Sequence, residues 1–265
     1  MAAQGGRRFG RTHATAERKE KNLHQKGERV EDFDVGQLAA YLHLTPDQVL
    51  RMVERDKLPG RKVQGEWRFA EAEIHHWLET RIGVSDLEQL DKVDAVLSRS
   101  RRPDQEIGRL VELLPVECIA VPLNARTRGS VIRAMADLAA QTGMLWDAPT
   151  MAEAVQVREA LHPTALDCGV ALLHPRRPQS SILSDSVIAL GICPAPLPFS
   201  DSGQLTDVFF LLASYDDRVH LQILARLTRM LADERFLEEL RAASSPGLAR
   251  LAFQEAEARV LEQEG

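Results

Sequence analysis

The segment Cys168-Gly-Val-Ala-Leu-Leu-His174-Pro-Arg-Arg177 places a histidine directly after a short apolar run. The run from Val170 to Leu173 predicts a buried strand, and Pro175 lacks the N–H that a further ladder hydrogen bond would need. We therefore expect the strand to end at His174, with the imidazole facing solvent. A second histidine, His220, begins an amphipathic helix 46 residues later. We expect the fold to bring the two imidazoles into one site.

Strands and helices alternate over the second half of the chain. Thr150 is expected to cap a helix, with Glu153 in the capping-box position. Residues 194–198 contain three prolines, which predict a connecting turn. The pattern indicates an α/β fold with a mixed β-sheet flanked by helices. The expected strands are residues 114–121, 170–173, 186–193 and 208–213, and the expected helices are residues 128–141, 150–161, 219–232, 234–243 and 246–263.

The two histidine segments resemble the enzyme IIA domain of the fructose, mannitol and nitrogen-regulatory branch of the bacterial phosphotransferase system. That family has a Gly-hydrophobic-Ala-hydrophobic-Pro-His strand and a His-Leu-x-x-Leu-Ala helix start. Here they read Gly169-Val-Ala-Leu-Leu-His174 and His220-Leu-Gln-Ile-Leu-Ala225. An Arg-Glu pair ahead of the strand corresponds to Arg158-Glu159. The resemblance extends from about Glu112 to the end of the chain.

This resemblance implies that a histidine-containing phosphocarrier protein phosphorylates His174, with His220 and Arg158 holding the phosphoryl oxygens. Such a transfer needs a neutral imidazole as nucleophile, an in-line approach and donors for the spread negative charge. The chain departs from the family on both sides of the acceptor, where Leu173 replaces a proline and Pro175 replaces a small residue. Pro175 removes a backbone donor that would otherwise contact the phosphoryl group.

Residues 31–80 carry a second motif. Thr45 and Pro46 are typical of the N-cap and the first position of a helix. The expected elements are helices at residues 36–42, 46–55 and 70–80, and a two-stranded wing at residues 61–69 that turns at Gln64-Gly65. Their order resembles the excisionase and MerR-like winged helix-turn-helix domain, which implies that this part of the chain binds DNA.

In that family the second helix enters the major groove and the wing touches the backbone. The resemblance therefore implies groove contacts by Gln48, Arg51 and Arg55, and phosphate contacts by Lys57, Arg61, Lys62 and Arg68. Three acids in the same region, Asp47, Glu54 and Asp56, would lie near phosphates and weaken the attraction.

The net charge of −6 is unevenly spread. Residues 1–30 contain eight Lys or Arg and three Glu, whereas residues 113–265 contain 13 basic and 19 acidic side chains. The first 30 residues have too few apolar side chains to offset the entropy of ordering, which predicts a disordered basic tail. Nucleic-acid binding must therefore rest on a local element and not on the charge of the whole chain.

Residues 81–112 link the two motifs, and the second domain is expected to span residues 113–265. Apolar residues at helical spacing predict a helix in the linker. This helix either pairs with a second copy through residues 84–97 or packs on a neighbouring domain. The residues that set the spacing are Leu87, Leu90, Val93 and Leu97.

Composition indicates a cytoplasmic protein. The start of the chain is polar, and no apolar run approaches the roughly 20 residues that cross a bilayer. Cys118, Cys168 and Cys193 are widely separated, which is typical of reduced core residues. His75 and His76 occupy adjacent helix positions and would point in different directions. We therefore expect no metal site and no cofactor.

Two classes of function follow. The first is a regulator that accepts a phosphoryl group on His174 and couples it to DNA or to a partner protein. The second is an unphosphorylated DNA-binding regulator or docking module with a degenerate enzyme IIA domain, for which Leu173 and Pro175 argue. In a variant of the first class, the domain serves a separate permease.

Overall fold

The computed structural model describes residues 32–42, 44–70, 73–74, 77, 107–161, 163–199 and 203–264. Four sequence predictions lie wholly or largely outside these residues. They are the disordered basic tail, the helix at residues 70–80, the histidine pair at 75–76, and the linker helix with residues 84–97.

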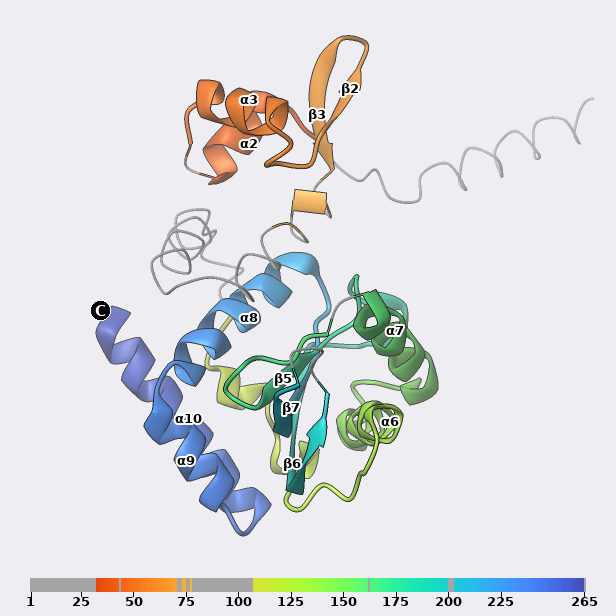
Figure 1. The fold of residues 1–265 in the computed structure, drawn as a ribbon, viewed down its shortest axis with the longest axis vertical. Coiled ribbons are helices and arrows are strands. Elements are labelled where there is room, and N and C mark those ends of the chain that lie inside the picture. Colours follow the sequence, from red (N-terminus) through yellow and green to blue (C-terminus); the bar gives the residue numbers. More distant parts are fainter. Residues whose placement is uncertain are drawn as a thin grey trace, which may run out of the picture.

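The elements named among the described residues of the N-terminal domain are two helices and a small three-stranded sheet (Figure 1). The N-cap expected at Thr45 is present and forms a capping box, because its side chain accepts from the Gln48 N–H while the Gln48 side chain accepts from the Thr45 N–H. Gln64 and Gly65 both have positive φ, 52° and 88°, as a two-residue hairpin turn requires. The elements are β1 (Asp32–Phe33), α2 (Val35–Leu42), α3 (Pro46–Glu54), β2 (Arg61–Val63) and β3 (Glu66–Ala70), with sheet order β1-β3-β2.

The C-terminal domain is built on a four-stranded mixed sheet of order β4-β6-β7-β5. The central pair, β6 and β7, is antiparallel, and each of these strands has a parallel neighbour on its other side. The strands are β4 (Ile119–Ala120), β5 (Val170–Leu173), β6 (Val187–Pro198) and β7 (Leu205–Ala213).

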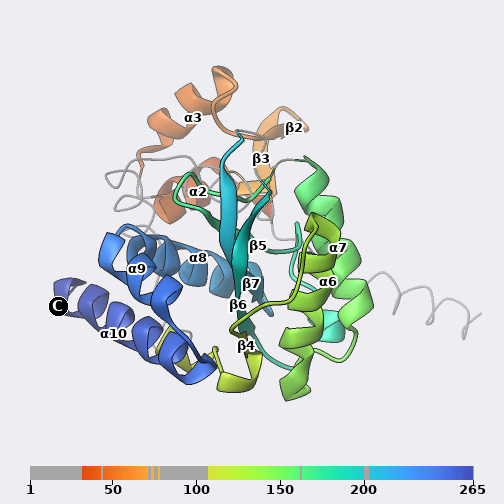
Figure 2. The ribbon, with the colours of Figure 1, turned by 60° about the horizontal axis from the view of Figure 1, so that its bottom comes forward.

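Helices cover both faces of this sheet (Figures 1 and 2). Alternate residues of β5 therefore enter different cores: Val170 and Leu172 pack with α8 to α10, and Ala171 and Leu173 pack with α6 and α7. This two-sided burial explains why the strand is a continuous apolar run. The mixed sheet with flanking helices confirms the predicted fold class. The helices are α6 (Arg128–Ala139) and α7 (Ala148–Leu161) on one face, and α8 (Asp217–Leu231), α9 (Glu234–Ala242) and α10 (Pro246–Glu264) on the other.

Three local predictions were wrong. Residues 194–198 continue β6 instead of forming a turn. The prolines are tolerated because they come after a register shift that follows Ile192. They also lie beyond the short pairing with β4, so no backbone N–H is required for a hydrogen bond on that side. Asp147, and not Thr150, accepts the hydrogen bonds at the start of α7. Most of residues 114–121 is not strand, since a 3₁₀ helix (Val116–Cys118) precedes the two-residue β4.

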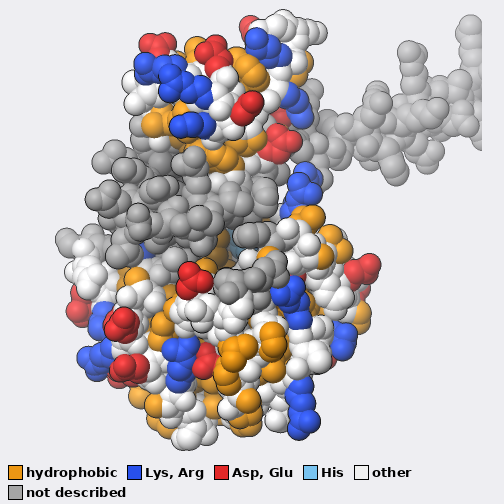
Figure 3. Space-filling model, in the orientation of Figure 1, with side chains coloured by type: hydrophobic (Ala, Val, Ile, Leu, Met, Phe, Trp, Pro, Cys, Tyr) orange, Lys and Arg blue, Asp and Glu red, His pale blue; other side chains and the backbone are white. Residues whose placement is uncertain are grey.

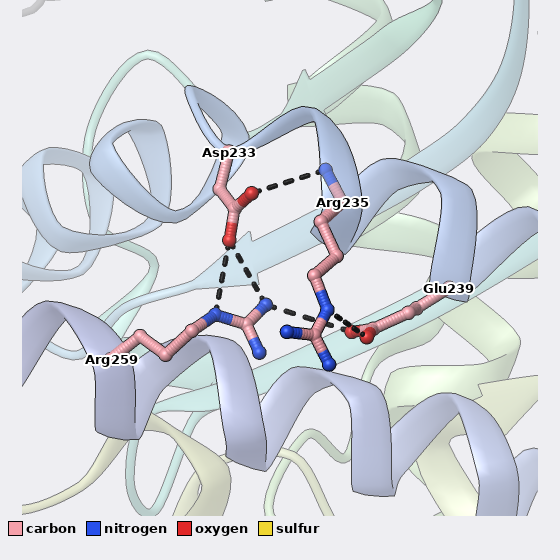
Figure 4. A network of polar contacts seen from close by, with 4 residues as sticks. All are labelled: Asp233, Arg235, Glu239 and Arg259. Carbon is pink, nitrogen blue, oxygen red and sulfur yellow. Dashed lines mark hydrogen bonds and ion pairs between the residues drawn. The ribbon is translucent and has the colours of Figure 1, made fainter.

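Charged side chains at the turn between α8 and α9, and within α9, form ion pairs with α10 (Figure 4). Asp233 caps α9 through the Arg235 N–H and also accepts from Arg259 on α10 at 3.0 Å. Glu239 accepts from the Arg235 side chain at 2.8 Å and pairs with Arg259. The network fixes the helical layer that carries α8, and α8 in turn positions His220.

The cysteines are free thiols, with Cys118 and Cys193 buried and Cys168 half-buried. Burial raises the pKa of Cys118 to about 11, so this thiol is protonated at neutral pH. Within the described ranges, no helix is both long and apolar enough to cross a membrane.

Candidate phosphoacceptor site

β5 delivers His174 to the end of the sheet. Gly169 directly precedes the strand, and its φ of +83° is a conformation that L side chains rarely adopt. The strand then pairs with β7 in parallel from Val170 to Leu173. The expectation that His174 faces solvent was wrong, because only 3% of the residue is exposed. Pro175 itself is buried beside the strand end.

A backbone hydrogen bond fixes the tautomer of His174. Its Nδ1 lies 2.8 Å from the carbonyl oxygen of Leu172. A carbonyl oxygen can only accept, so Nδ1 carries the proton and donates it. The other ring nitrogen, Nε2, therefore keeps its lone pair in the neutral imidazole.

The second imidazole comes from the first turn of α8. Asp216 caps this helix by accepting from the Val219 N–H at 2.8 Å, and His220 follows one residue later. The rings of His174 and His220 lie 4.9 Å apart between centroids, with planes inclined by 48°. The Ser214 hydroxyl is 3.2 Å from Nδ1 of His220. The structure thus brings together the two histidines that the sequence singled out.

Ser214 was absent from the sequence prediction. It follows the apolar end of β7 (Leu205–Ala213) in the same way that His174 follows β5. Its position, as a polar residue at the end of a second apolar strand, was the sequence feature that could have identified it as a site residue. The residue is 2% exposed, so its hydroxyl bonds within the protein.

Arg158 and Glu159 occupy the last turns of α7 and are both buried, at 6% and 2% exposure. Glu159 accepts hydrogen bonds from the Thr164 backbone N–H, at 3.1 Å, and from its hydroxyl. Burial raises the pKa of Glu159, although the Thr164 hydrogen bonds and the charge of Arg158 oppose the shift. The Thr164 carbonyl in turn accepts from the Leu172 N–H at 3.2 Å. Glu159 is therefore connected to the residue whose carbonyl orients His174.

The candidate DNA residues divide into two groups. Arg51, Arg55 and Lys57 are exposed at or just beyond the second half of α3. The wing residues all have partners within the domain: Arg61 pairs with Asp32 at 2.7 Å, Arg68 pairs with Glu66 at 2.8 Å, and Lys62 lies 5.0 Å from the ring centre of Trp67. The amide oxygen of Gln48 is used in the helix cap. Figure 3 shows that basic and acidic side chains are interspersed on this domain.

Residues 112–252 match the family described as "Phosphoenolpyruvate-dependent sugar phosphotransferase system, EIIA 2", and residues 33–82 match a helix-turn-helix domain family. The EIIABC component of the 2-O-alpha-mannosyl-D-glycerate-specific PTS system of Escherichia coli is 30% identical over 134 residues, which are 48% of this chain and 20% of that protein. The multiphosphoryl transfer protein of Rhodobacter capsulatus is 28% identical over 127 residues, which are 48% of this chain and 15% of that protein. The chain thus spans about a fifth or less of the length of these relatives.

Among solved structures, the nitrogen regulatory protein IIA-Ntr of Neisseria meningitidis has the same fold as the C-terminal domain. The superposition has a TM-score of 0.50 at 20% identity, and it covers 54% of this chain and 98% of that one. The EIIA 2 match covers more than half of the residues. The chain therefore belongs to the EIIA 2 family of the sugar phosphotransferase system and carries a helix-turn-helix domain ahead of its EIIA domain.

Proposed function

We propose that Nε2 of His174 accepts a phosphoryl group from a histidine-containing phosphocarrier protein in the cytoplasm. The phosphorylation state then controls how the N-terminal domain binds DNA or a partner protein. The observation that carries the proposal is the 4.9 Å pairing of His174 with His220, with Nδ1 of His174 committed to the Leu172 carbonyl. Family membership supports the phosphoryl-transfer part, and the helix-turn-helix match supports the output.

The proposed transfer replaces one P–N bond with another. The Nε2 lone pair attacks phosphorus in line with the carrier's imidazole, and the P–N bond of the carrier breaks with its electron pair returning to the carrier nitrogen. Nδ1 of His174 keeps its proton throughout, so no proton has to move. The ring becomes cationic as the new bond forms, and the Leu172 carbonyl stabilises that charge through its hydrogen bond.

His220 has a distinct role in this proposal. If the Ser214 hydroxyl donates to Nδ1 of His220, the proton of the neutral ring resides on Nε2, which can then donate to a phosphoryl oxygen. Arg158 supplies a planar fork of donors for the same oxygens. Both groups stabilise negative charge where it spreads in the transition state.

A second function is an unphosphorylated regulator or docking module. It is favoured by the flanks of the acceptor, Leu173 and Pro175, and by the 3% exposure of His174. In this case the N-terminal domain would bind DNA or protein without any dependence on the phosphocarrier.

Incubating the full chain with a phosphorylated phosphocarrier separates the two functions. The phosphotransferase regulator predicts acid-labile phosphate on the wild type and none on His174→Ala. Arg126→Ala, which removes an exposed charge just before α6, should be labelled like the wild type. If the wild type stays unlabelled with an active carrier, the docking-module function stands in its place.

A further inference from the structure

The four residues that follow the acceptor histidine, Pro175-Arg-Arg-Pro178, face two different places. Pro175 and Pro178 line a small hollow together with Ser214 and His220. The two arginines line a separate pocket of about 500 Å³ whose opposite wall belongs to the N-terminal domain. Both arginines are exposed, whereas Pro175 is buried. The 175–178 segment thus separates the histidine site from the N-terminal domain.

The two walls of this pocket have opposite charge. The N-terminal wall contributes two acids, Asp56 and Glu73, and one base, Lys57, while the 175–178 segment contributes two arginines. The net charges are therefore −1 and +2. Unlike charges that line one pocket attract each other across it, and salt screens this attraction over a length of about 8 Å at physiological ionic strength. The arginines are suited to hold the acidic wall of the N-terminal domain.

Apolar packing also joins the two domains. The buried side chains of the N-terminal domain and those beneath α8 to α10 form one continuous cluster. Phe69 and Ile74 represent the first group, and Leu110 and Leu221 the second. The N-terminal domain is therefore docked on the EIIA domain, and the charged pocket lies at that contact.

We propose that the 175–178 segment couples phosphorylation of His174 to the docking of the N-terminal domain. The coupling rests on the proposed function for its physiological trigger. Two peptide units separate His174 from Arg176, which places their Cα atoms within about 7 Å. A phosphoryl dianion on Nε2 attracts both guanidinium groups, and the acidic wall of the pocket loses its counter-charges.

Steric displacement of the 175–178 segment by the phosphoryl group also favours release of the N-terminal domain. A phosphoryl group beside His220 needs space next to the hollow that Pro175 and Pro178 line. Proline fixes φ, so the two prolines stiffen the segment, and displacement on the histidine side moves the arginines on the other side. Phosphorylation therefore weakens the attraction between the arginines and the acidic wall, and the N-terminal domain is released.

Two tryptophans report on the pocket directly. Trp67 and Trp77 both line it, and the Trp77 indole N–H donates to the Lys57 carbonyl at 2.7 Å. The third tryptophan of the chain, Trp146, is 59% exposed on the EIIA domain and is not part of the pocket. The three indole N–H resonances in an NMR spectrum of the full chain therefore contain two reporters and one reference.

The test compares these resonances in four proteins. Arg176→Ala/Arg177→Ala removes the basic wall, and Arg126→Ala/Arg133→Ala is the matched control, with the same change of charge at exposed positions outside the pocket. His174→Glu places a negative charge at the acceptor without any phosphocarrier. We expect the Trp67 and Trp77 resonances to shift in the first and third variants, while Trp146 stays in place and the control matches the wild type.

The outcomes separate the coupling from the proposed function. Unmoved Trp67 and Trp77 resonances in either Arg176→Ala/Arg177→Ala or His174→Glu overturn the coupling. If His174→Glu does not fold, Pro175→Gly/Pro178→Gly loosens the same segment and must shift the same two resonances. If these variants behave as expected but the carrier fails to phosphorylate the wild type, the coupling stands and the proposed trigger is wrong. A phosphorylated wild type with unmoved resonances also overturns the coupling.

Discussion

The imidazoles of His174 and His220 lie 4.9 Å apart between ring centroids, although 46 positions separate the two residues in the chain. One ring is oriented by the Leu172 carbonyl and the other lies beside the Ser214 hydroxyl. Both rings are almost fully buried. The hydrogen-bond partners of both rings are therefore in place in the free protein, and such preorganisation favours electrostatic stabilisation of the transition state of the proposed transfer.

His220→Ala should slow phosphoryl acceptance by His174 by roughly 10²-fold, because it removes one donor proposed to contact the phosphoryl oxygens. Ser214→Ala should cause a smaller loss, since it changes only the group beside Nδ1 of His220. Single-turnover transfer from a phosphorylated carrier measures both rates. A His220→Ala protein that transfers at the wild-type rate would remove His220 from the mechanism.

Pro175→Gly should accelerate phosphoryl transfer, because it restores the backbone N–H that proline lacks next to the acceptor. The same transfer assay measures the rate. Pro178→Gly is the matched control, since it also loosens the segment but adds its N–H farther from His174. Equal acceleration in both variants would assign the effect to flexibility, and no change in either would show that the missing donor does not limit transfer.

Gly169→Ala should destabilise the EIIA domain by about 1–3 kcal/mol, the usual cost of a sparsely populated backbone conformation. The added Cβ would lie 2.8 Å from the Arg241 guanidinium, which bridges Asp207 and the Cys168 carbonyl. Urea unfolding gives the free-energy change. Gly247→Ala, where a Cβ meets no atom within 4 Å, should be neutral or stabilising.

Glu159 should make stability depend on pH. Burial raises its pKa above the ordinary value of 4.5, so the folded protein holds this proton more tightly than the unfolded chain does. The contribution to stability is fully present below about 4.5 and is lost as pH rises through the folded-state pKa. Glu159→Gln should flatten this part of the urea-midpoint profile, and the exposed Glu153→Gln should not. Parallel profiles for wild type and Glu159→Gln would contradict the assignment.

The elements that could be predicted from the sequence are those with a strong local pattern. The apolar run of β5 and the glycine turn of the wing were both found in the structure. The two segments around His174 and His220 were sufficient to indicate the EIIA family. Where the local pattern was ambiguous, as with the prolines at the end of β6, the prediction failed because pairing to β7 continues past a register shift that the sequence does not reveal.

Long-range polar contacts were beyond sequence reasoning. Glu257 is fully buried in α10 and accepts from the backbone N–H groups of Leu110 and Val111, about 146 positions away. The burial of His174 has the same origin, because it depends on how the residues after the strand fold back. Such contacts depend on tertiary packing, and no periodicity of the chain encodes them.

The central claim is that Nε2 of His174 is the phosphoacceptor, and heteronuclear NMR of the phosphorylated, histidine-labelled protein tests it most directly. The expected spectrum shows phosphorus coupled to Nε2 of His174, with Nδ1 still protonated and bonded to the Leu172 carbonyl. Phosphorus on Nδ1, on His220, or on no histidine in the presence of an active carrier would contradict the claim.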